Sequence, residues 1–441
     1  YTYEELAPVL ITYLKEHGYN YVEIMPLCEY PCDESWGYQD TGYFSPTSRY
    51  GKPEELKSFV DQCHQGGIGV ILDFVPVHFA VNDYALAEYD GTALYEYPNM
   101  AVGRNEWGSC NFMHSRGEVC SFLQSSAYYW MKEFHFDGLR MDAVGNLIYW
   151  QGDQQRGENL AALKFIRTMN QGLKERIPEC LLFAEDSTPY QGVTKPVWEG
   201  GLGFDYKWDL GWMHDTLSYF QADANERREK YHKLTFSMMY FYNERYILPL
   251  SHDEVVHGKA TIAQKMNGGY DGKFPQARAF YMYMYAHPGA KLNFMGNELA
   301  QLKEWCEKDE LDWGLLKFPI HEAFHKFMAD LNKCYLKNNA FFQRDFTQGG
   351  FCWVDCHQEQ KCMYLFERIS GEQKVLAVFN FSDETQEYTL EKDYAGYELL
   401  LASDMVKYGG KKRYTKKEKE IKGGKAVFKM GPFSARYYLV K

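Results

Sequence analysis

Four acidic residues interrupt apolar runs that are typical of buried strands. They are Asp73 in VILDFVPVHF, Asp142 in GLRMDAV, Glu185 in LLFAEDS and Asp253 in LPLSHDEV. A single acid at the end of a strand is commonly the cap of the helix that follows. Four such acids in one chain are hard to explain as caps, and they indicate a shared site if the strands end at the same face.

The neighbours of these acids indicate which chemistry they perform. Arg140 and Asp142 lie two residues apart, so their side chains share one face of a strand. A guanidinium there favours the ionised carboxylate, as a nucleophile requires. Glu185, facing other carboxylates, is expected to keep its proton, which suits a general acid. Glycosidic bond cleavage needs this division of roles, and His78 and His252 are expected to donate hydrogen bonds to sugar hydroxyls.

Other uses of these residue types fit the sequence less well. His252 and His257 are five residues apart rather than four, so SHDEVVHGK is not a helical zinc motif. We find no calcium loop with Asp and Asn at alternating positions, and no GxSxG nucleophile. We therefore expect neither a metal nor an organic cofactor.

Helical patterns alternate with strands that are apolar throughout, which is typical of a parallel sheet covered by helices. Seven such strands favour an α/β fold of the (β/α)8 barrel type over an open doubly wound sheet, and no GxGxxG turn supports dinucleotide binding. In a barrel the carboxyl ends of the strands share one face, so the four acids are expected to converge there. The expected strands cover residues 21–27, 70–75, 138–144, 180–186, 203–208, 246–251 and 291–296.

From about Asp345 the sequence changes to short alternating strands separated by glycine and charged turns. This pattern predicts an all-β, antiparallel C-terminal sandwich without a helix. The predicted domains are therefore a catalytic barrel over residues 1–344 and a β-sandwich over residues 345–441. The expected strands of the second domain cover residues 351–356, 362–369, 374–382, 397–404, 425–430 and 435–441.

The predicted barrel lacks one strand at its beginning. The chain opens with a helix, for which Thr2 and Glu5 have capping-box spacing, while Pro8 predicts a kink or a start one turn later. A closed barrel needs eight strands, and only seven are found. We expect the first strand to be missing, so that the strands at 21–27 and 291–296 leave an open gap between them and the chain is a fragment of a longer protein.

Composition excludes several classes of function. The 441 residues carry a net charge of −12, which disfavours binding to nucleic acid or an anionic membrane, and no apolar stretch is long enough to span a bilayer. The 11 cysteines form no CxxC pair, and the segment YTYEELAPVL has neither a basic region nor a cleavage site, so secretion is not expected. We therefore expect reduced thiols and a cytoplasmic monomer. Aromatic residues reach 17%; Trp36, Tyr38, Trp305 and Trp313 are candidate sugar platforms, whereas Trp212 is expected in the core.

Four segments, DFVPVH, GLRMDAV, AEDST and LSHDEV, resemble the signature regions of the α-amylase clan of glycoside hydrolases and transglycosylases. Within that clan the chain resembles the bacterial glycogen branching enzymes. The stretches that carry this closer resemblance are residues 36–51, 89–99, 200–220 and 295–313, of which 200–220 is the most specific.

The resemblance implies roles for the acids. Asp142 matches the nucleophile, Glu185 the acid/base, and Asp253 the third carboxylate, which holds sugar hydroxyls. Tyr38 matches the aromatic residue that stacks on the sugar at the cleavage site. The remaining polar lining corresponds to Asp73, His78, Arg140 and His252.

The implied reaction is transfer of an α-1,4-glucan segment to a 6-hydroxyl in glycogen biosynthesis, with the α-glucan as donor and acceptor. Two rivals remain: an α-amylase-type hydrolase, which uses the same carboxylates, and a glucan-binding protein without catalysis. The chain departs from the family in two respects. Residues 146–160 form a shorter stretch than the matching family loop, and the usual N-terminal β domain is not found before the barrel.

Overall fold

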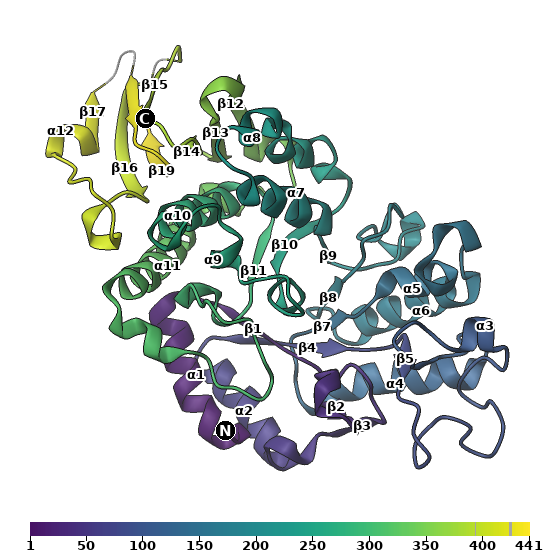
Figure 1. Ribbon diagram of the computed structural model, residues 1–441. Helices are drawn as coiled ribbons and strands as arrows, with labels where there is room; N and C mark the ends of the chain where they lie inside the picture. The colour runs from purple at the N-terminus through teal and green to yellow at the C-terminus, as the bar shows by residue number, and fades with distance from the viewer. Residues whose placement is uncertain (393, 423–425) are drawn as a thin grey trace. The chain divides into compact units, whose positions relative to one another are not determined.

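The computed structural model describes residues 1–392, 394–422 and 426–441 (Figure 1). These residues form two compact units. The first contains residues 1–208 and 243–245, and the second contains residues 209–242 and 246–441.

The first unit is built on a parallel sheet with strand order β1-β4-β7-β8-β9. Its central strands are buried on both faces, as the continuous apolar runs predicted. The register places Asp73 opposite Arg140 and Arg140 opposite Phe183. The strands are β1 (Tyr21–Ile24), β4 (Gly69–Phe74), β7 (Gly138–Met141), β8 (Leu181–Ala184) and β9 (Tyr206–Trp208).

Helices connect these strands, and α1 and α2 lie side by side (Figure 1). The expected capping box of Thr2 and Glu5 is present, and Pro8 lies inside a helix that begins at Tyr3 rather than one turn later. The helices are α1 (Tyr3–His17), α2 (Pro53–Gln65), α3 (Met100–Gly103), α4 (Gly117–Glu133), α5 (Val144–Ile148) and α6 (Leu160–Arg176). Two short antiparallel strand pairs accompany this sheet: β2 (Cys28–Glu29) pairs with β3 (Gly42–Pro46), and β5 (His78–Phe79) pairs with β6 (Cys110–Asn111).

The second unit begins with helices and a parallel pair of strands, β10 (Tyr246–Leu250) and β11 (Ala290–Asn293). With the five strands of the first unit, they make up the seven that the sequence predicted. Trp212 is buried, as expected. The helices are α7 (Leu210–Gln221), α8 (Glu226–Glu229), α9 (Ile262–Lys265), α10 (Tyr270–Ala286) and α11 (Pro319–Lys337).

The C-terminal part of this unit contains an antiparallel sheet of order β12-β13-β14-β19-β16-β17 and a second pair, β15-β18. Side chains of both sheets, including Leu376, Tyr438 and Phe428, share one apolar cluster, as a sandwich requires. The strands are β12 (Phe351–Gln358), β13 (Met363–Ser370), β14 (Gln373–Asn380), β15 (Gln386–Thr389), β16 (Gly396–Ala402), β17 (Glu420–Lys422), β18 (Val427–Met430) and β19 (Ser434–Val440).

One detail of the predicted sandwich was wrong. A short helix, α12 (Lys416–Lys419), lies between β16 and β17, because Thr415 and Glu418 form a capping box in what looked like a charged turn. The first residue of the strand expected at 425–430 lies outside the described residues.

The fold class is confirmed as parallel α/β followed by antiparallel sheets. In the described part of the chain, β1 pairs with β4 alone and β11 pairs with β10 alone, which are the two free edges that the sequence predicted. A domain boundary at residue 344 stays a prediction. Among the described residues, no helix is both long and apolar enough to cross a membrane.

Candidate active site

In the first unit, the carboxyl ends of three adjacent strands bring acidic side chains together. Asp73 lies in β4, Asp142 directly follows β7, and Glu185 directly follows β8. Backbone hydrogen bonds continue beyond the strands, from Asp142 N to Phe74 O at 3.1 Å and from Glu185 N to Met141 O at 3.0 Å. The acids are therefore held on the rigid ends of the sheet.

Arg140 joins the three acids. Its Nη1 lies 2.8 Å from both carboxylate oxygens of Asp73 and 2.9 Å from Asp142 Oδ1, and its Nη2 lies 3.8 Å from Glu185 Oε2. Arg140 is 1% exposed, whereas the side chains of Asp142 and Glu185 are 16% and 22% exposed. The arginine is thus buried beneath two carboxylates that a substrate can reach.

The acids outnumber the cation that pairs with them. Burial, with smaller contributions from Asp142 and Glu23, raises the pKa of Asp73 to about 8 even though Arg140 opposes the shift. Burial also raises the pKa of Glu23, on β1, to about 7. We conclude that this carboxylate cluster keeps a bound proton near neutral pH.

Tyr38 and His78 lie against the same group. The hydroxyl of Tyr38 donates to Asp73 Oδ2 at 2.5 Å, and His78 Nε2 lies 2.9 Å from the carbonyl oxygen of Tyr38. Burial raises the pKa of Tyr38 and lowers the pKa of His78, so the phenol keeps its proton and the imidazole stays neutral. The sequence-predicted residues of the first unit thus lie together.

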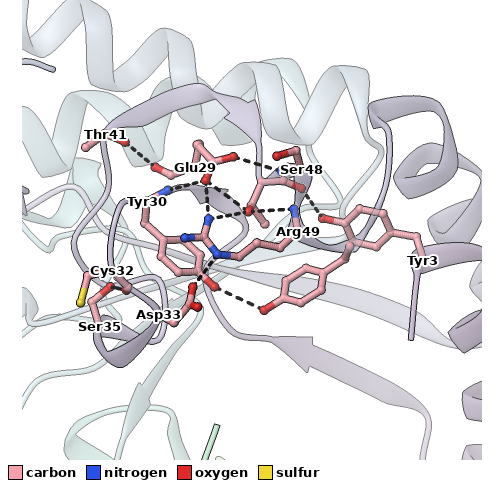
Figure 2. A network of polar contacts seen from close by, with 11 residues as sticks. Tyr3, Glu29, Tyr30, Cys32, Asp33, Ser35, Thr41, Ser48 and Arg49 are labelled. Carbon is pink, nitrogen blue, oxygen red and sulfur yellow. Dashed lines mark hydrogen bonds and ion pairs between the residues drawn. The ribbon is translucent and has the colours of Figure 1, made fainter. Parts of the chain in front are cut away.

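A polar network holds the loop that carries Tyr38 (Figure 2). Arg49 Nε donates to Asp33 Oδ1 at 2.7 Å, its Nη1 donates to Glu29 Oε1 at 2.5 Å, and its guanidinium carbon lies 4.0 Å from the Tyr30 ring centroid. Asp33 begins a 3-10 turn that is closed by a hydrogen bond from Trp36 N to Asp33 O at 3.0 Å, and Tyr38 N then donates to Ser35 O at 2.9 Å. Arg49 therefore links the start of the segment that carries Tyr38 to Glu29 on β2.

Glu185 accepts a backbone hydrogen bond in addition to its contact with Arg140. Ala143 N donates to Glu185 Oε2 at 2.7 Å, and Val144 N donates to Glu185 O at 2.9 Å. Ala143 has a left-handed backbone (φ 46°), which turns its N–H toward the glutamate directly after Asp142. The segment after the expected nucleophile thus helps to orient the expected acid/base.

Asp253 and His252 lie in the second unit, after β10. They occupy a 3-10 turn (His252–Val255), and His252 Nε2 lies 3.7 Å from Asp253 Oδ1. His252 is buried beside Phe294 and Trp305, and the side chain of Asp253 is half-exposed. Lys259 Nζ donates to Asp253 O at 2.8 Å, which holds the turn.

Two aromatic residues of the first unit were missed from the sequence. The Trp208 ring centroid lies 4.4 Å from the guanidinium carbon of Arg140, and the half-exposed Trp107 ring lies 5.3 Å from the His78 ring. Trp208 could have been found from the sequence, because it is the last residue of an expected strand. Its side chain lies on the same face of that strand as the side chain of Tyr206, two residues earlier. Trp107 lies in a loop without periodicity, so no local signal marks it.

No group of three or more His, Cys, Asp or Glu side chains in residues 1–392, 394–422 and 426–441 is arranged as a metal site.

Comparisons with known proteins show the family of this chain. The family model "Alpha amylase, catalytic domain" matches residues 10–91, and "Alpha amylase, C-terminal all-beta domain" matches residues 353–441. The 1,4-alpha-glucan branching enzyme GlgB of Marinobacter nauticus is 45% identical over 93% of this chain and 67% of the relative. GlgB of Nitrosomonas europaea is 46% identical over 93% of this chain and 58% of the relative.

The chain belongs to the 1,4-α-glucan branching enzyme family. A further member, GlgB of Geobacillus stearothermophilus, is 43% identical over 93% of this chain and 65% of its own length. The chain therefore spans 58–67% of the length of these three branching enzymes.

Solved structures show the fold that this branching-enzyme chain shares with amylases. The α-amylase of Geobacillus thermoleovorans, solved in complex with acarbose, matches 100% of this chain and 92% of its own, with a TM-score of 0.71 and 16% identity. An Anoxybacillus α-amylase matches 100% of this chain and 90% of its own, with the same TM-score and identity.

Proposed function

We propose that this chain catalyses branching of an α-1,4-glucan by a retaining double displacement, with Asp142 as nucleophile and Glu185 as acid/base. The main observation behind this proposal is that the carboxylates of Asp142 and Glu185 both lie next to the buried guanidinium of Arg140. A retaining mechanism needs the two carboxyl groups about 5–5.5 Å apart. Placement at the ends of adjacent strands supports such a separation.

In the first step, Asp142 attacks the anomeric carbon of the donor glucan while Glu185 protonates the departing glycosidic oxygen. The glucan segment becomes an ester of Asp142, and the rest of the donor leaves with the proton of Glu185. In the second step, Glu185 removes the proton from a 6-hydroxyl of an acceptor glucan, which attacks the ester. Two inversions restore the α configuration in the new α-1,6 bond.

The remaining residues support this cycle. Arg140 stabilises the Asp142 carboxylate, which is the form that attacks, and the neutral Tyr38 is suited to stacking on the sugar. Asp73, His78 and His252 are proposed to bind sugar hydroxyls. The role proposed for Asp253, binding hydroxyls of the distorted transition-state ring, rests on the family resemblance of its segment LSHDEV.

The donor and acceptor are proposed to be α-1,4-glucans such as amylose or glycogen, and the working form a cytoplasmic monomer without a metal or cofactor. All 11 cysteines are free, which supports a reducing compartment.

The main alternative is hydrolysis of the same ester by water. Incubation of the full chain with amylose separates the two reactions. Branching is expected to lower the iodine colour without a rise in reducing ends, and debranching with isoamylase is expected to release the transferred chains. A rise in reducing ends that accompanies the loss of colour would establish a hydrolase. Binding of amylose with no change in either signal would establish a glucan-binding protein.

A further inference from the structure

A buried ion pair lies directly behind Glu185 and has no part in the mechanism above. Lys207 Nζ, on β9, lies 2.8 Å from Asp186 Oδ2, and Asp186 follows Glu185 in the chain. The two side chains are 7% and 0% exposed. Burial of two charges is costly, so the pair contributes specificity of position rather than much net stability.

Further hydrogen bonds to Thr188 hold both members of the pair. Lys207 Nζ donates to Thr188 O at 2.9 Å, while Thr188 N donates to Asp186 Oδ1 at 2.9 Å and Thr188 Oγ1 donates to Asp186 Oδ2 at 3.1 Å. The segment that leaves β8 is therefore folded back on the ammonium group of β9. A buried network with several hydrogen bonds favours a single arrangement of its backbone.

The same arrangement reaches the segment after Asp142. A Cβ atom at Gly145 would lie 2.9 Å from Thr188 Cγ2 and 3.1 Å from Asp186 Oδ1, so only glycine permits this close approach. Two residues earlier, Ala143 N donates to Glu185 Oε2. The Lys207 pair thus fixes both the backbone that carries Glu185 and the segment that orients its carboxyl group.

Adjacent residues of β9 act on opposite faces of the sheet. Trp208 packs on Arg140, and Lys207, the preceding residue, points to the other face. Among the described interactions, Lys207 consequently has no contact with the guanidinium of Arg140 or with Asp142. Its polar partners are Asp186 and Thr188, in the segment that follows Glu185.

We propose that Lys207 is a positioning residue for the acid/base Glu185 and acts through its ion pair with Asp186. This inference rests on the proposed function. It predicts that loss of the ion pair impairs proton transfer by Glu185 more than nucleophilic attack by Asp142.

A change of leaving group separates these two steps. Amylose needs Glu185 to protonate the departing oxygen, whereas α-maltosyl fluoride releases fluoride without a general acid, and added azide accepts the sugar without a general base. We expect Lys207→Met to lower kcat/KM for amylose by about 100-fold, the loss that small misplacement of a catalytic group produces. The kcat/KM for α-maltosyl fluoride with azide should change less than about threefold.

A lone Lys207→Met leaves Asp186 buried and unpaired, which can prevent folding. The double variant Lys207→Met/Asp186→Asn carries neither charge and therefore tests the same ion pair without leaving a buried charge unpaired. Its thermal unfolding is measured first, and the selective loss on amylose is expected again. Equal losses on both donors, or no loss on amylose, in the folded double variant would overturn the proposal.

Lys174→Met is the matched control. Lys174 Nζ lies 2.6 Å from Asp205 Oδ2, and Asp205 accepts a hydrogen bond from Leu182 N, at the opposite end of β8 and β9. This variant should keep the wild-type ratio of the two activities; a selective loss on amylose here would also overturn the proposal. A wild-type chain inactive on both donors would refute the proposed function, and the inference with it.

Discussion

The Trp208 ring lies 4.4 Å from the guanidinium carbon of Arg140, and both side chains are buried. The guanidinium nitrogens of Arg140 point toward the carboxylates of Asp73, Asp142 and Glu185, and the Trp208 ring packs against the guanidinium. The ring excludes water from the guanidinium without competing for its hydrogen bonds, and its electrostatic attraction for a desolvated cation is about 2 kcal/mol.

Replacing Trp208 tests this contact. Trp208 Nε1 has no hydrogen-bond partner among the described residues, so Trp208→Phe removes ring area but no hydrogen bond. We expect a loss of about 1–3 kcal/mol in the free energy of unfolding, and a larger relative fall in kcat on amylose because Arg140 gains freedom. Urea unfolding and initial rates measure the two effects.

Trp130→Phe is the control for that experiment. Trp130 is also fully buried, but its Nε1 donates to Tyr43 O at 3.0 Å, away from Arg140. It should lose stability while the folded protein keeps its activity. An equal fall in kcat for both variants would contradict a special role of Trp208.

Asp142→Asn should abolish turnover of amylose while leaving the fold intact. The amide has nearly the same shape and its oxygen can still accept from Arg140, but it cannot form the covalent ester. Circular dichroism and the unfolding temperature check the fold, and reducing-end and iodine assays check turnover. Substantial residual turnover would remove Asp142 from the nucleophile's role.

Stability is expected to fall in acid because His114 is buried in its neutral form. Its ring lies 4.9 Å from that of Phe165, its Nε2 lies 3.0 Å from Pro76 O, and burial lowers its pKa to about 4. The unfolded chain binds this proton near pH 6.5 and the folded chain near pH 4. The stabilisation is therefore complete above pH 6.5 and is lost as the pH falls toward 4, with a total of about 3 kcal/mol.

His114→Gln removes this titration but keeps a donor for Pro76 O. The free energy of unfolding, measured by urea between pH 4.5 and 7.5, should depend less steeply on pH than in the wild type. The same substitution at the exposed His357 serves as control. If the free energy of unfolding depends on pH equally steeply in the wild type and in His114→Gln, groups other than His114 cause the loss of stability in acid.

Arg49→Lys should loosen the loop that carries Tyr38. A lysine is a single point charge and cannot hold Glu29 and Asp33 in the forked geometry of the guanidinium. Because the pairs are partly exposed, we expect a stability loss of only about 1 kcal/mol. KM for short α-glucans should rise severalfold, since the Tyr38 ring is less well placed.

The surface pair of Lys57 and Glu133, 3.6 Å apart, provides the comparison. Lys57→Met should change neither KM nor kcat. If Arg49→Lys also leaves KM unchanged, the network in Figure 2 stabilises the loop without positioning Tyr38.

The local sequence pattern was sufficient to predict the parallel strands and the acidic residues at their ends. A run such as VILDFV has only one polar residue, and an acid there is visible without knowledge of the fold. The relation between Arg140 and Asp142 also followed from the sequence, because residues two apart on a strand share a face. The capping box at Thr2 and Glu5 was predictable for the same reason: both partners lie within one helical turn.

Contacts between strands were decided only by the tertiary structure. The register of β4 against β7 sets Asp73 on the same Nη1 atom as Asp142, and the pairing of β8 with β9 brings Lys207 to Asp186. No spacing in the sequence encodes which residue of one strand lies opposite which residue of another. The raised pKa values of Asp73 and Glu23 likewise depend on burial and on neighbours distant in the chain, so the residue types were readable from the sequence but their charge states required the fold.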